Sequence, residues 1–462
     1  MQVSTTRAAL SIPDIRSSVS GEVIGPDDPG YDQTRQVVNG AIDKRPAVIV
    51  RVADATDVTR VIALARETGL ELAVRSGGHS AAGHSVSDGG IVLDLRALKG
   101  LDFDVPARTV WADAGLTARE VTEAAAEHGL AIGFGDTGSV GIGGITLGGG
   151  VGYLVRKHGL TIDNLLAVDI VTADGELRRV DKGNDPELFW AIRGGGGNFG
   201  VVTRFKFALN PLDGIVGGLL ILPATPETIA GFIAAAEAAP DELSTIANVM
   251  TAPPMPFLPE DVVGTTIILA IVAYAGDATD GERALAPFRE LATPLADMVQ
   301  AIPYPQIYPP DDESYRPTAA AVNMFIDHVD TGVATTILDH LAAIEAPMRV
   351  AQLRVLGGAM ARVPSEATAF AHRDARIMVN LAAFYGPDDR AEKEAWVARF
   401  RDALDQGDRR VYSNFLADEG EARVRAAYPG ATWERLVAVK QQYDPDNLFR
   451  LNQNIPPTGA AA

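Results

Sequence analysis

The sequence predicts an α+β protein of two domains, and its length and internal pattern lead to this prediction. The chain has 462 residues, more than one ordinary domain holds. Up to about residue 210, short apolar strands and capped helices alternate with glycine-rich loops. From Pro211 onward, apolar strands alternate with alanine-rich helices, which favours a second domain built on an antiparallel sheet.

The first elements surround a glycine-rich loop. Residues 47–52 alternate in polarity as a strand does, and Thr56 or Asp57 is expected to cap a helix over 58–68 that ends at Gly69. Strands are expected on both sides of the loop, over 70–74 and 91–95.

The remaining elements follow from the same signals. In the first part, Thr117 is expected to cap a helix over 118–128, another helix begins at 186–190, and strands are expected over 110–115, 167–172, 176–181 and 201–209. In the second part, strands are expected over 217–223, 265–272 and 350–356, with helices over 226–239, 280–292, 333–345 and 388–405.

The first glycine-rich loop contains Ser76, Gly77, Gly78, His79 and Ser80. Glycines let the backbone approach a ligand closely, and successive N–H groups can bind a diphosphate. A lone histidine is usually a surface or core residue. A histidine held between glycines and two strands is a better candidate for cofactor contact.

A second glycine-rich stretch covers residues 135–153 and contains Ile, Val and Leu rather than the Ser of a flexible linker. So many glycines disfavour a helix. The pattern indicates backbone packed against a large planar or phosphorylated ligand.

A third stretch, Gly195–Gly200, fits G-x-G-x-x-G. It follows a helix-like segment and opens a strand, the reverse of a Rossmann fingerprint, so it does not predict a nicotinamide site. No G-x-x-x-x-G-K-[ST] pattern occurs, which argues against a P-loop nucleotide site.

Composition excludes several classes. The chain has 40 Lys and Arg against 60 Asp and Glu, a net charge of −20, which disfavours nucleic acid and anionic membranes as partners. It has no Cys and no histidine spacing typical of a metal site, so we expect no metal. The N-terminus lacks a signal-peptide core, and no run approaches the ~18 apolar residues of a membrane span. We expect a cytoplasmic monomer or homodimer.

Five segments resemble those of the covalent flavoproteins of the vanillyl-alcohol oxidase superfamily, and more narrowly the berberine-bridge-enzyme-like FAD-linked oxidases. They occur in the family's order, at 75–80, 140–150, 159–164, 189–203 and 443–455. The resemblance implies a PCMH-type FAD-binding domain over 1–210, an inserted substrate domain over 211–410 and a C-terminal segment over 411–462 that returns to the FAD domain.

The resemblance also implies how FAD is held. In this family a histidine at the position of His79 bonds covalently to the 8α-methyl group of the flavin. Residues expected at the cofactor are Arg75, Ser76, Gly77, Gly78, His79, Ser80, His84, Thr137, Gly138, Val140, Gly141, Gly143, Gly144, Gly148, Gly149, Val202, Asn452 and Asn454. A structural role is the alternative for His84, and capping of the terminal turn is an equal alternative for Asn452 and Asn454.

Thr137 departs from the family pattern. Many relatives carry a second covalent link through a cysteine there, and this chain has none. The chain therefore resembles the mono-covalent branch, in which amine oxidation and oxygenative tailoring of natural products are known. Sugar oxidation, common among bicovalent members, is less expected.

Four residues are candidates for substrate chemistry. Tyr412 resembles a family tyrosine that faces the substrate and is the candidate base, although its ordinary pKa of about 10 requires phenolate stabilisation. A tyrosine whose hydroxyl only binds the substrate or the backbone is an equal alternative. Tyr153, Gln352 and Arg354 are candidates for the pocket wall, with a solvent-facing strand face as the alternative for Gln352 and Arg354. Where relatives have a carboxylate base near position 352, this chain offers an amide, and Phe415 replaces a frequent second tyrosine.

The expected function is an FAD-dependent oxidase that transfers a hydride from a small organic substrate to covalent FAD, with O2 as acceptor. Two alternatives stay open: a flavin-dependent enzyme that inserts oxygen into a natural product, and a flavin-binding protein without turnover.

Overall fold

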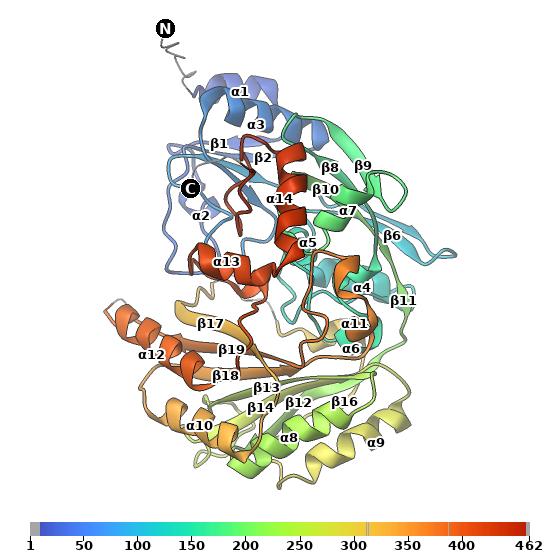
Figure 1. Cartoon of the computed structure of the whole chain (residues 1–462), viewed down its shortest axis with the longest axis vertical. Helices are drawn as coiled ribbons and strands as arrows, with labels where there is room; N and C mark the ends of the chain where they lie inside the picture. The colour runs from blue at the N-terminus through green and yellow to red at the C-terminus, as the bar shows by residue number, and fades with distance from the viewer. Residues whose placement is uncertain (1–9, 311, 313, 387, 459–462) are drawn as a thin grey trace.

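The computed structural model describes residues 10–310, 312, 314–386 and 388–458. The expectation that the N-terminus lacks a signal-peptide core falls mainly on residues 1–9, which lie outside the described residues. Figure 1 shows the N-terminal sheets at one end of the molecule and a large sheet at the other, with the C-terminal helices against the N-terminal part.

A small sheet carries the first glycine-rich loop. Its order is β1 (Glu22–Ile24), β2 (Val48–Arg51), β4 (Ile91–Asp94) and β3 (Leu72–Arg75), and β2, β4 and β3 run parallel. Helices α1 (Ile12–Ser18), α2 (Tyr31–Thr34) and α3 (Ala55–Thr68) belong to the same part. The His79 loop connects β3 directly to β4, with no helix between them. Because these two strands are buried neighbours in the sheet, they fix both ends of the loop.

The cap of α3 differs from the expectation. Asp54 caps it by accepting a hydrogen bond from the Asp57 N–H at 3.0 Å, so neither Thr56 nor Asp57 is the cap. The buried Asp57 carboxylate instead accepts hydrogen bonds from the backbone N–H groups of Ser20, Gly21 and Ala53.

A second, antiparallel sheet has the order β5 (Leu101–Asp104), β6 (Thr109–Asp113), β10 (Val201–Ala208), β8 (Leu165–Val171) and β9 (Leu177–Asp181). Helix α4 (Ala118–Ala126) begins with the expected Thr117 cap. The short β7 (Leu130–Ala131) pairs with β11 (Asn210–Pro211), and α7 (Pro186–Ala191) precedes the loop that leads into β10. The G-x-G-x-x-G segment thus opens a strand, as predicted.

The second glycine-rich stretch contains a short helix that the sequence did not predict. α5 (Ile142–Leu147) is followed by α6 (Val155–His158) and the 3-10 turn η1 (Thr161–Asn164). Close packing explains the glycines within it: a Cβ on Gly143 would lie 3.0 Å from the Ser76 Cβ. Glycine disfavours a helix, but here the Gly143 N–H donates to the Ser76 Oγ at 3.3 Å and joins this short helix to the first glycine loop.

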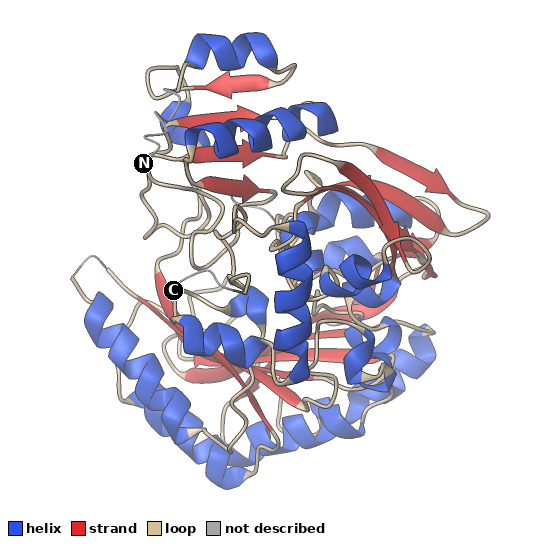
Figure 2. Cartoon of the chain, turned by 45° about the horizontal axis from the view of Figure 1, so that its top comes forward, coloured by secondary structure: helices blue, strands red, loops and turns tan. Residues whose placement is uncertain are grey.

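The large sheet is antiparallel throughout. Its order is β15 (Ala296–Asp297), β12 (Ile215–Pro223), β14 (Thr266–Tyr274), β13 (Leu243–Thr251), β18 (Arg349–Val355), β19 (Ile377–Phe384) and β17 (Ala319–Ile326), with β16 (Gln300–Ile302) also paired to β12. Figure 2 shows helices over its outer face, where α8 (Pro226–Ala238), α9 (Ala278–Arg289), α10 (Thr331–Ala342) and α12 (Arg390–Ala403) pack on an apolar cluster.

The C-terminal segment lies against the N-terminal part. It contains η4 (Ser413–Phe415), α13 (Glu421–Ala427) and α14 (Ala431–Tyr443), and α14 packs on α7. The remaining short elements are η2 (Tyr304–Ile307), α11 (Ala359–Arg362) and η3 (Ser365–Ala367). We propose the division at 1–210, 211–410 and 411–462 as the domain boundaries, because residues 427–455 and the N-terminal sheets share one apolar cluster. No helix in the described ranges is long and apolar enough to span a bilayer.

Candidate cofactor and substrate site

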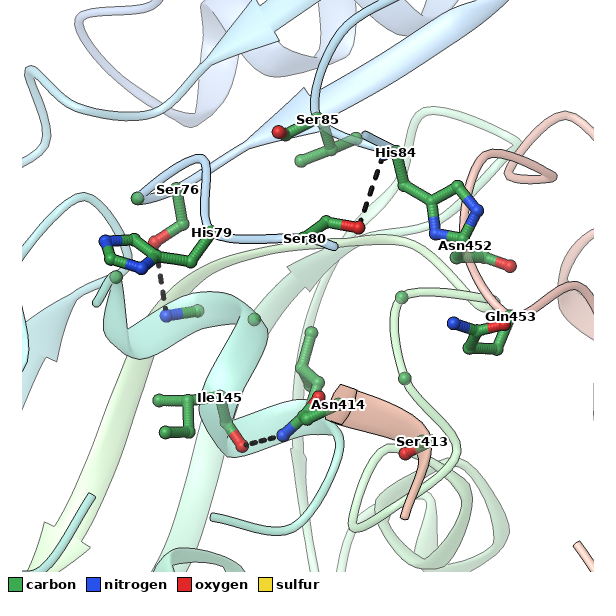
Figure 3. Close-up of a pocket in the computed structure, with 18 of the residues that line it drawn as sticks. Ser76, His79, Ser80, His84, Ser85, Ile145, Ser413, Asn414, Asn452 and Gln453 are labelled. Atoms are coloured by element: carbon green, nitrogen blue, oxygen red, sulfur yellow. Dashed lines mark hydrogen bonds between the residues drawn. The ribbon is translucent and has the colours of Figure 1, made fainter. Parts of the chain in front are cut away.

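A cavity of about 410 Å³ lies where the three parts of the chain meet. Its walls come from the His79 loop, the α5 region, the loop before β10, the C-terminal segment and the inner face of the large sheet. The residues of these walls are 72, 74, 76–81, 84, 85, 95, 136, 137, 140, 141, 143–145, 147, 196, 197, 200–202, 321, 380, 413–416, 428, 449 and 451–453. Figure 3 shows the His79 loop along one side, with Asn414 and Ile145 opposite.

Hydrogen bonds fix the His79 loop from within. The Ser76 Oγ donates to the Ala114 carbonyl at 2.7 Å and accepts from the Gly143 N–H at 3.3 Å, which ties the loop to α5. The Ser80 Oγ accepts from the His84 N–H at 3.3 Å. Gly78 has a φ of 78°, a conformation that glycine adopts without strain. His79 therefore lines the cavity from a loop held at both ends.

Arg75 supports this loop from behind. Its side chain is 1% exposed and donates to the carbonyls of Ser85, at 3.1 Å, Arg35, at 3.2 Å, and Thr34. Burial lowers its pKa to about 10. Arg75 is absent from the cavity wall in the described structure, so its position indicates loop support rather than direct contact.

His84 occupies the other end of the loop and lines the cavity. Burial, and after it the charge of the nearby Lys44, lower its pKa to about 4. The imidazole is therefore neutral at pH 7, and it can act as a hydrogen-bond donor or acceptor without adding charge.

The glycines divide into two groups. Gly77 and Gly141 bring two backbones together, since a Cβ on Gly77 would lie 2.2 Å from the Gly141 nitrogen. At Gly144 and Gly197 an added Cβ would meet nothing within 4 Å, so these glycines leave open space at the cavity wall. Such a wall of bare backbone fits a flat ligand.

Three predicted cofactor glycines lie outside the cavity wall. An added Cβ on Gly138 would lie 2.9 Å from the Arg119 guanidinium, one on Gly148 2.0 Å from the Asn414 Oδ1, and one on Gly149 3.0 Å from the Phe370 ring. The absence of a Cβ at these glycines leaves room for the neighbouring side chains of Arg119, Asn414 and Phe370. The other predicted wall residues, Thr137, Val140 and Val202, line the cavity.

The C-terminal segment closes the cavity through Asn452 and Gln453. The Asn452 Nδ2 donates to the Phe449 carbonyl at 2.9 Å, and the Gln453 Nε2 donates to the Leu416 carbonyl at 3.1 Å. The Oδ1 atoms of Asn452 and Asn454 are buried without a partner among the described residues, and Asn454 lies outside the cavity wall. An unpaired oxygen in a cavity wall suits a ligand donor.

A buried ion pair holds this closing segment. Lys440 and Asp444 are both 0% exposed, with a Nζ–Oδ2 distance of 2.6 Å. The Lys440 Nζ also donates to the carbonyls of Asn198, at 2.8 Å, and Phe449, at 2.9 Å. The Asn198 side chain donates to the Gln453 carbonyl at 3.1 Å and accepts from the Ile455 N–H at 2.9 Å. The ion pair thus joins the loop before β10 to the segment over the cavity.

Tyr412 lies beneath the cavity wall. Its side chain is 2% exposed, and its hydroxyl oxygen accepts hydrogen bonds from the Gly150 N–H at 3.0 Å, the Val151 N–H at 3.3 Å and the Asn414 Nδ2 at 2.9 Å. Burial raises its pKa, and the three donors oppose that rise. The neighbouring Asn414 and Phe415 line the cavity in its place.

The predicted substrate residues form a polar network. The Arg354 Nε donates to the Gln352 Oε1 at 3.0 Å, the Gln352 Nε2 donates to the Asn248 Oδ1 at 2.9 Å, and Arg354 forms an ion pair with Asp136. Asp136 lines the cavity, whereas Gln352 and Arg354 lie behind it. The network connects the large sheet with the loop that contains Thr137.

Tyr153 also lies behind the wall. Its hydroxyl donates to the Asp136 carbonyl at 3.2 Å, and its ring centroid lies 6.0 Å from that of Tyr308. Burial raises the pKa of Tyr153 well above its ordinary value. Tyr153 therefore supports the Asp136 loop as a neutral phenol.

Sequence reasoning missed several wall residues. Ser413, Asn414 and Phe415 adjoin Tyr412, and the Tyr-x-Asn pattern was the available signal. Asn380 also lines the cavity, and its place at an alternating position of a strand was the available signal. Among the described residues, no group of three or more His, Cys, Asp or Glu side chains could hold a metal ion.

The comparisons with known proteins agree with this geometry. The FAD binding domain family matches residues 46–181, and the family described as berberine and berberine like matches residues 411–456. The chain is 32% identical over 459 residues to (R)-6-hydroxynicotine oxidase of Paenarthrobacter nicotinovorans, covering 96% of this chain and 98% of that protein.

Solved structures show the same fold. The 6-hydroxy-D-nicotine oxidase of Arthrobacter nicotinovorans superimposes with a TM-score of 0.85 at 29% identity, covering 95% of this chain and 98% of that one. The berberine-bridge-enzyme-like protein 1 of Physcomitrella patens has a TM-score of 0.86 at 20% identity, covering 98% and 100%, and shows the fold alone.

The fold and the site define an FAD-linked oxidoreductase with a PCMH-type FAD-binding fold. Within that class, this chain belongs to the berberine-bridge-enzyme-like family and is an FAD-dependent oxidase that acts on a small molecule. These findings confirm the fold class, the family and the class of enzyme that the sequence predicts.

Proposed function

We propose that this chain is a mono-covalent flavin oxidase, in which a ring nitrogen of His79 bonds to the 8α-methyl group of FAD and O2 accepts the electrons. The observation that carries the proposal is the position of His79 in the wall of the cavity, on a loop that Arg75 and Ser76 hold in place. With Thr137 at the position of the second link, His79 is the one residue proposed to form a covalent bond.

The residues of the cavity fit FAD. Bare backbone at Gly144 and Gly197 suits a flat ring system, and the Ser76–Ser80 backbone suits a diphosphate. The unpaired oxygens of Ser85 and Asn452 are available to donors of the cofactor. The negative charge of a diphosphate suits this loop, since no Asp or Glu among residues 76–85 opposes it.

Bound FAD supplies a two-electron acceptor that takes a hydride from a substrate C–H bond and passes the electrons to O2, giving hydrogen peroxide. Asn452 and Gln453 bring the C-terminal segment into the wall of the same cavity. The Asp136–Arg354 pair keeps the Thr137 loop at the substrate side.

For Tyr412 we propose a positioning role rather than the role of a base. Because its hydroxyl oxygen accepts three N–H groups of the protein, we propose that Tyr412 positions Asn414 and the 150–151 backbone. A role as catalytic base stays a prediction, which the pH profile of a variant decides.

A small organic substrate with a nitrogen heterocycle is the first to try, because a relative of nearly full-length similarity is named for 6-hydroxynicotine. The test is release of hydrogen peroxide from the purified protein across alcohols, hydroxylated N-heterocycles and aromatic polyketides. Peroxide in equal amount to the two-electron product is expected. Label from 18O2 in the product would instead indicate an oxygenating enzyme. If no compound of the panel reduces the flavin under anaerobic conditions, the protein is not an oxidase of these substrate classes.

A cytoplasmic location and a monomeric or homodimeric state stay predictions.

A further inference from the structure

Four amide side chains form a row across the inner face of the large sheet. Asn248 on β13 pairs in register with Gln352 on β18, Gln352 pairs with Asn380 on β19, and Asn380 pairs with Asn323 on β17. Directly opposed residues of an antiparallel sheet point to the same side. The alternate residues, such as Leu353 and Val379, pack in the apolar cluster under the helices, so the amides face the cavity side.

Three of these amides already bind protein groups. The Asn248 Nδ2 donates to the Leu269 carbonyl at 3.1 Å, Gln352 joins Asn248 to Arg354, and the Asn323 Oδ1 accepts from the Tyr412 N–H at 2.8 Å. Their positions are therefore fixed by the fold.

Asn380 differs from the other three. It is half-buried and lines the cavity, and its carboxamide has no hydrogen-bond partner among the described residues. The Nδ2 of the neighbouring Asn323 is also without a partner in that part of the chain, but it is buried. A carboxamide that lines a cavity and makes no bond to the protein is accessible to a ligand, which can satisfy its donor and its acceptor.

The charge of the cavity wall indicates which charge state of a ligand the cavity favours. Of the residues that line the cavity in the described structure, Asp136 is the only Asp, Glu, Lys or Arg, and Arg354 compensates it. A charged substrate group at Asn380 would have no opposite charge to pair with and would bear a desolvation cost. A carboxamide offers a donor and an acceptor side by side, which match the acceptor and donor of another amide.

Resting on the proposed function, we propose that Asn380 determines the specificity of the site by forming paired hydrogen bonds with a neutral lactam or carboxamide group of the substrate. The wall residues between 76 and 85 belong to the proposed flavin site. Asn380 and Ala321 are the cavity residues that the large sheet supplies in the described structure, so this side is left for the substrate.

The test uses the FAD-loaded protein and three six-membered rings: δ-valerolactam, which is neutral, piperidine, which is a cation at pH 7, and cyclohexanecarboxylate, which is an anion. Binding is followed under anaerobic conditions by the change in flavin absorbance. The wild type is expected to bind δ-valerolactam more tightly than either charged ring. Asn380→Leu should weaken lactam binding about tenfold, the value of one to two lost hydrogen bonds, and Asn380→Asp should shift the preference to piperidine.

Asn184→Asp is the matched control, because Asn184 is exposed and its side chain bonds only to the Arg179 carbonyl in the described structure. It should bind all three rings as the wild type does. A wild type that prefers either charged ring, or that does not bind the lactam, overturns the proposal. The same holds if Asn380→Leu binds the lactam as the wild type does.

The absorbance spectra without ligand separate this proposal from the one on which it rests. The unliganded spectra of the wild type and Asn380→Leu are expected to agree. A change in that spectrum would mean that Asn380 contacts the flavin, which overturns its role in substrate recognition. A wild type that contains no flavin and takes up none would instead contradict the proposed function itself.

Discussion

Tyr412 shows that a family pattern can leave the role of a single residue open. The sequence allowed a base that faces the substrate or a tyrosine whose hydroxyl only binds the substrate or the backbone, and in the described structure the hydroxyl lies behind the cavity wall with three N–H donors around it. Nothing in the Tyr-x-Asn pattern distinguishes these two roles.

Replacing Tyr412 by Phe tests its role. The change leaves three N–H groups without their acceptor, so we expect a loss of about 1–3 kcal/mol in unfolding free energy, measured by urea unfolding. Because burial raises the Tyr412 pKa above 10, a catalytic base would make the wild-type rate rise toward alkaline pH.

As a positioning residue, Tyr412 should lower the rate when replaced without changing the shape of the pH profile. Loss of an alkaline rise in Tyr412→Phe would instead establish it as the base. Tyr315→Phe is the control, since Tyr315 is 54% exposed and should leave both measurements unchanged.

At the scale of elements, the sequence was most informative where a helix-capping residue is followed by apolar residues at helical spacing. The helix from Ala118, with its Thr117 cap, and the four helices of the second part were predicted closely. Strands β13 and β17 were missed because β13 is buried at nearly every position and β17 begins with three alanines, so neither shows the alternation of a half-buried strand. The short α5 was missed because its glycines serve a contact with Ser76 that lies 67 residues away.

The closing segment depends on one ion pair, which gives a prediction for Lys440→Met. Removing the ammonium leaves the buried Asp444 carboxylate without its charge partner, so we expect about 3–5 kcal/mol lower unfolding free energy in urea. In the His79→Ala background, the same change should also speed the loss of FAD on dialysis, because Phe449 and Asn198 lose their shared donor.

Lys99→Met is the control for that variant. Lys99 and Glu120 form a surface ion pair at 2.6 Å in which both side chains are 42% exposed, so its loss should cost less than about 1 kcal/mol. Equal effects of the two variants would contradict the role given to the buried pair.

At the scale of the whole molecule, buried histidines make stability depend on pH. Burial lowers the pKa of His84, His158 and His372 to about 4, against an ordinary value of 6.5. Between these values the unfolded chain binds protons that the folded chain does not, so the unfolding free energy must fall as the pH falls from about 6.5 to about 4.

Urea unfolding at pH 7 and pH 5 measures this loss. His372→Asn should reduce the difference between the two pH values, because it removes one of the three sites, while the exposed His328→Asn should not. An unchanged pH difference in His372→Asn would contradict the assignment of a neutral buried imidazole. The variant's lower stability at pH 7 does not affect this comparison, which concerns the difference alone.

The architecture of the molecule was more predictable than the details of its site. Glycine-rich loops and the family's segment order singled out Ser76, His79, Thr137 and Gly144, which line the cavity, while their contact with FAD stays a prediction. Asn380 could not be assigned to the wall from sequence, because its place depends on the pairing of β18 with β19 and on how the large sheet meets the cavity.

The most direct test of the central proposal is to precipitate the purified protein with acid and measure whether the flavin stays with the pellet. Flavin should remain in the pellet of the wild type and move to the supernatant in His79→Ala, which keeps the fold but lacks the proposed bond. Flavin released by the wild type would contradict covalent attachment through His79, although FAD could still bind in the cavity. Flavin retained by His79→Ala would mean that another residue forms the bond.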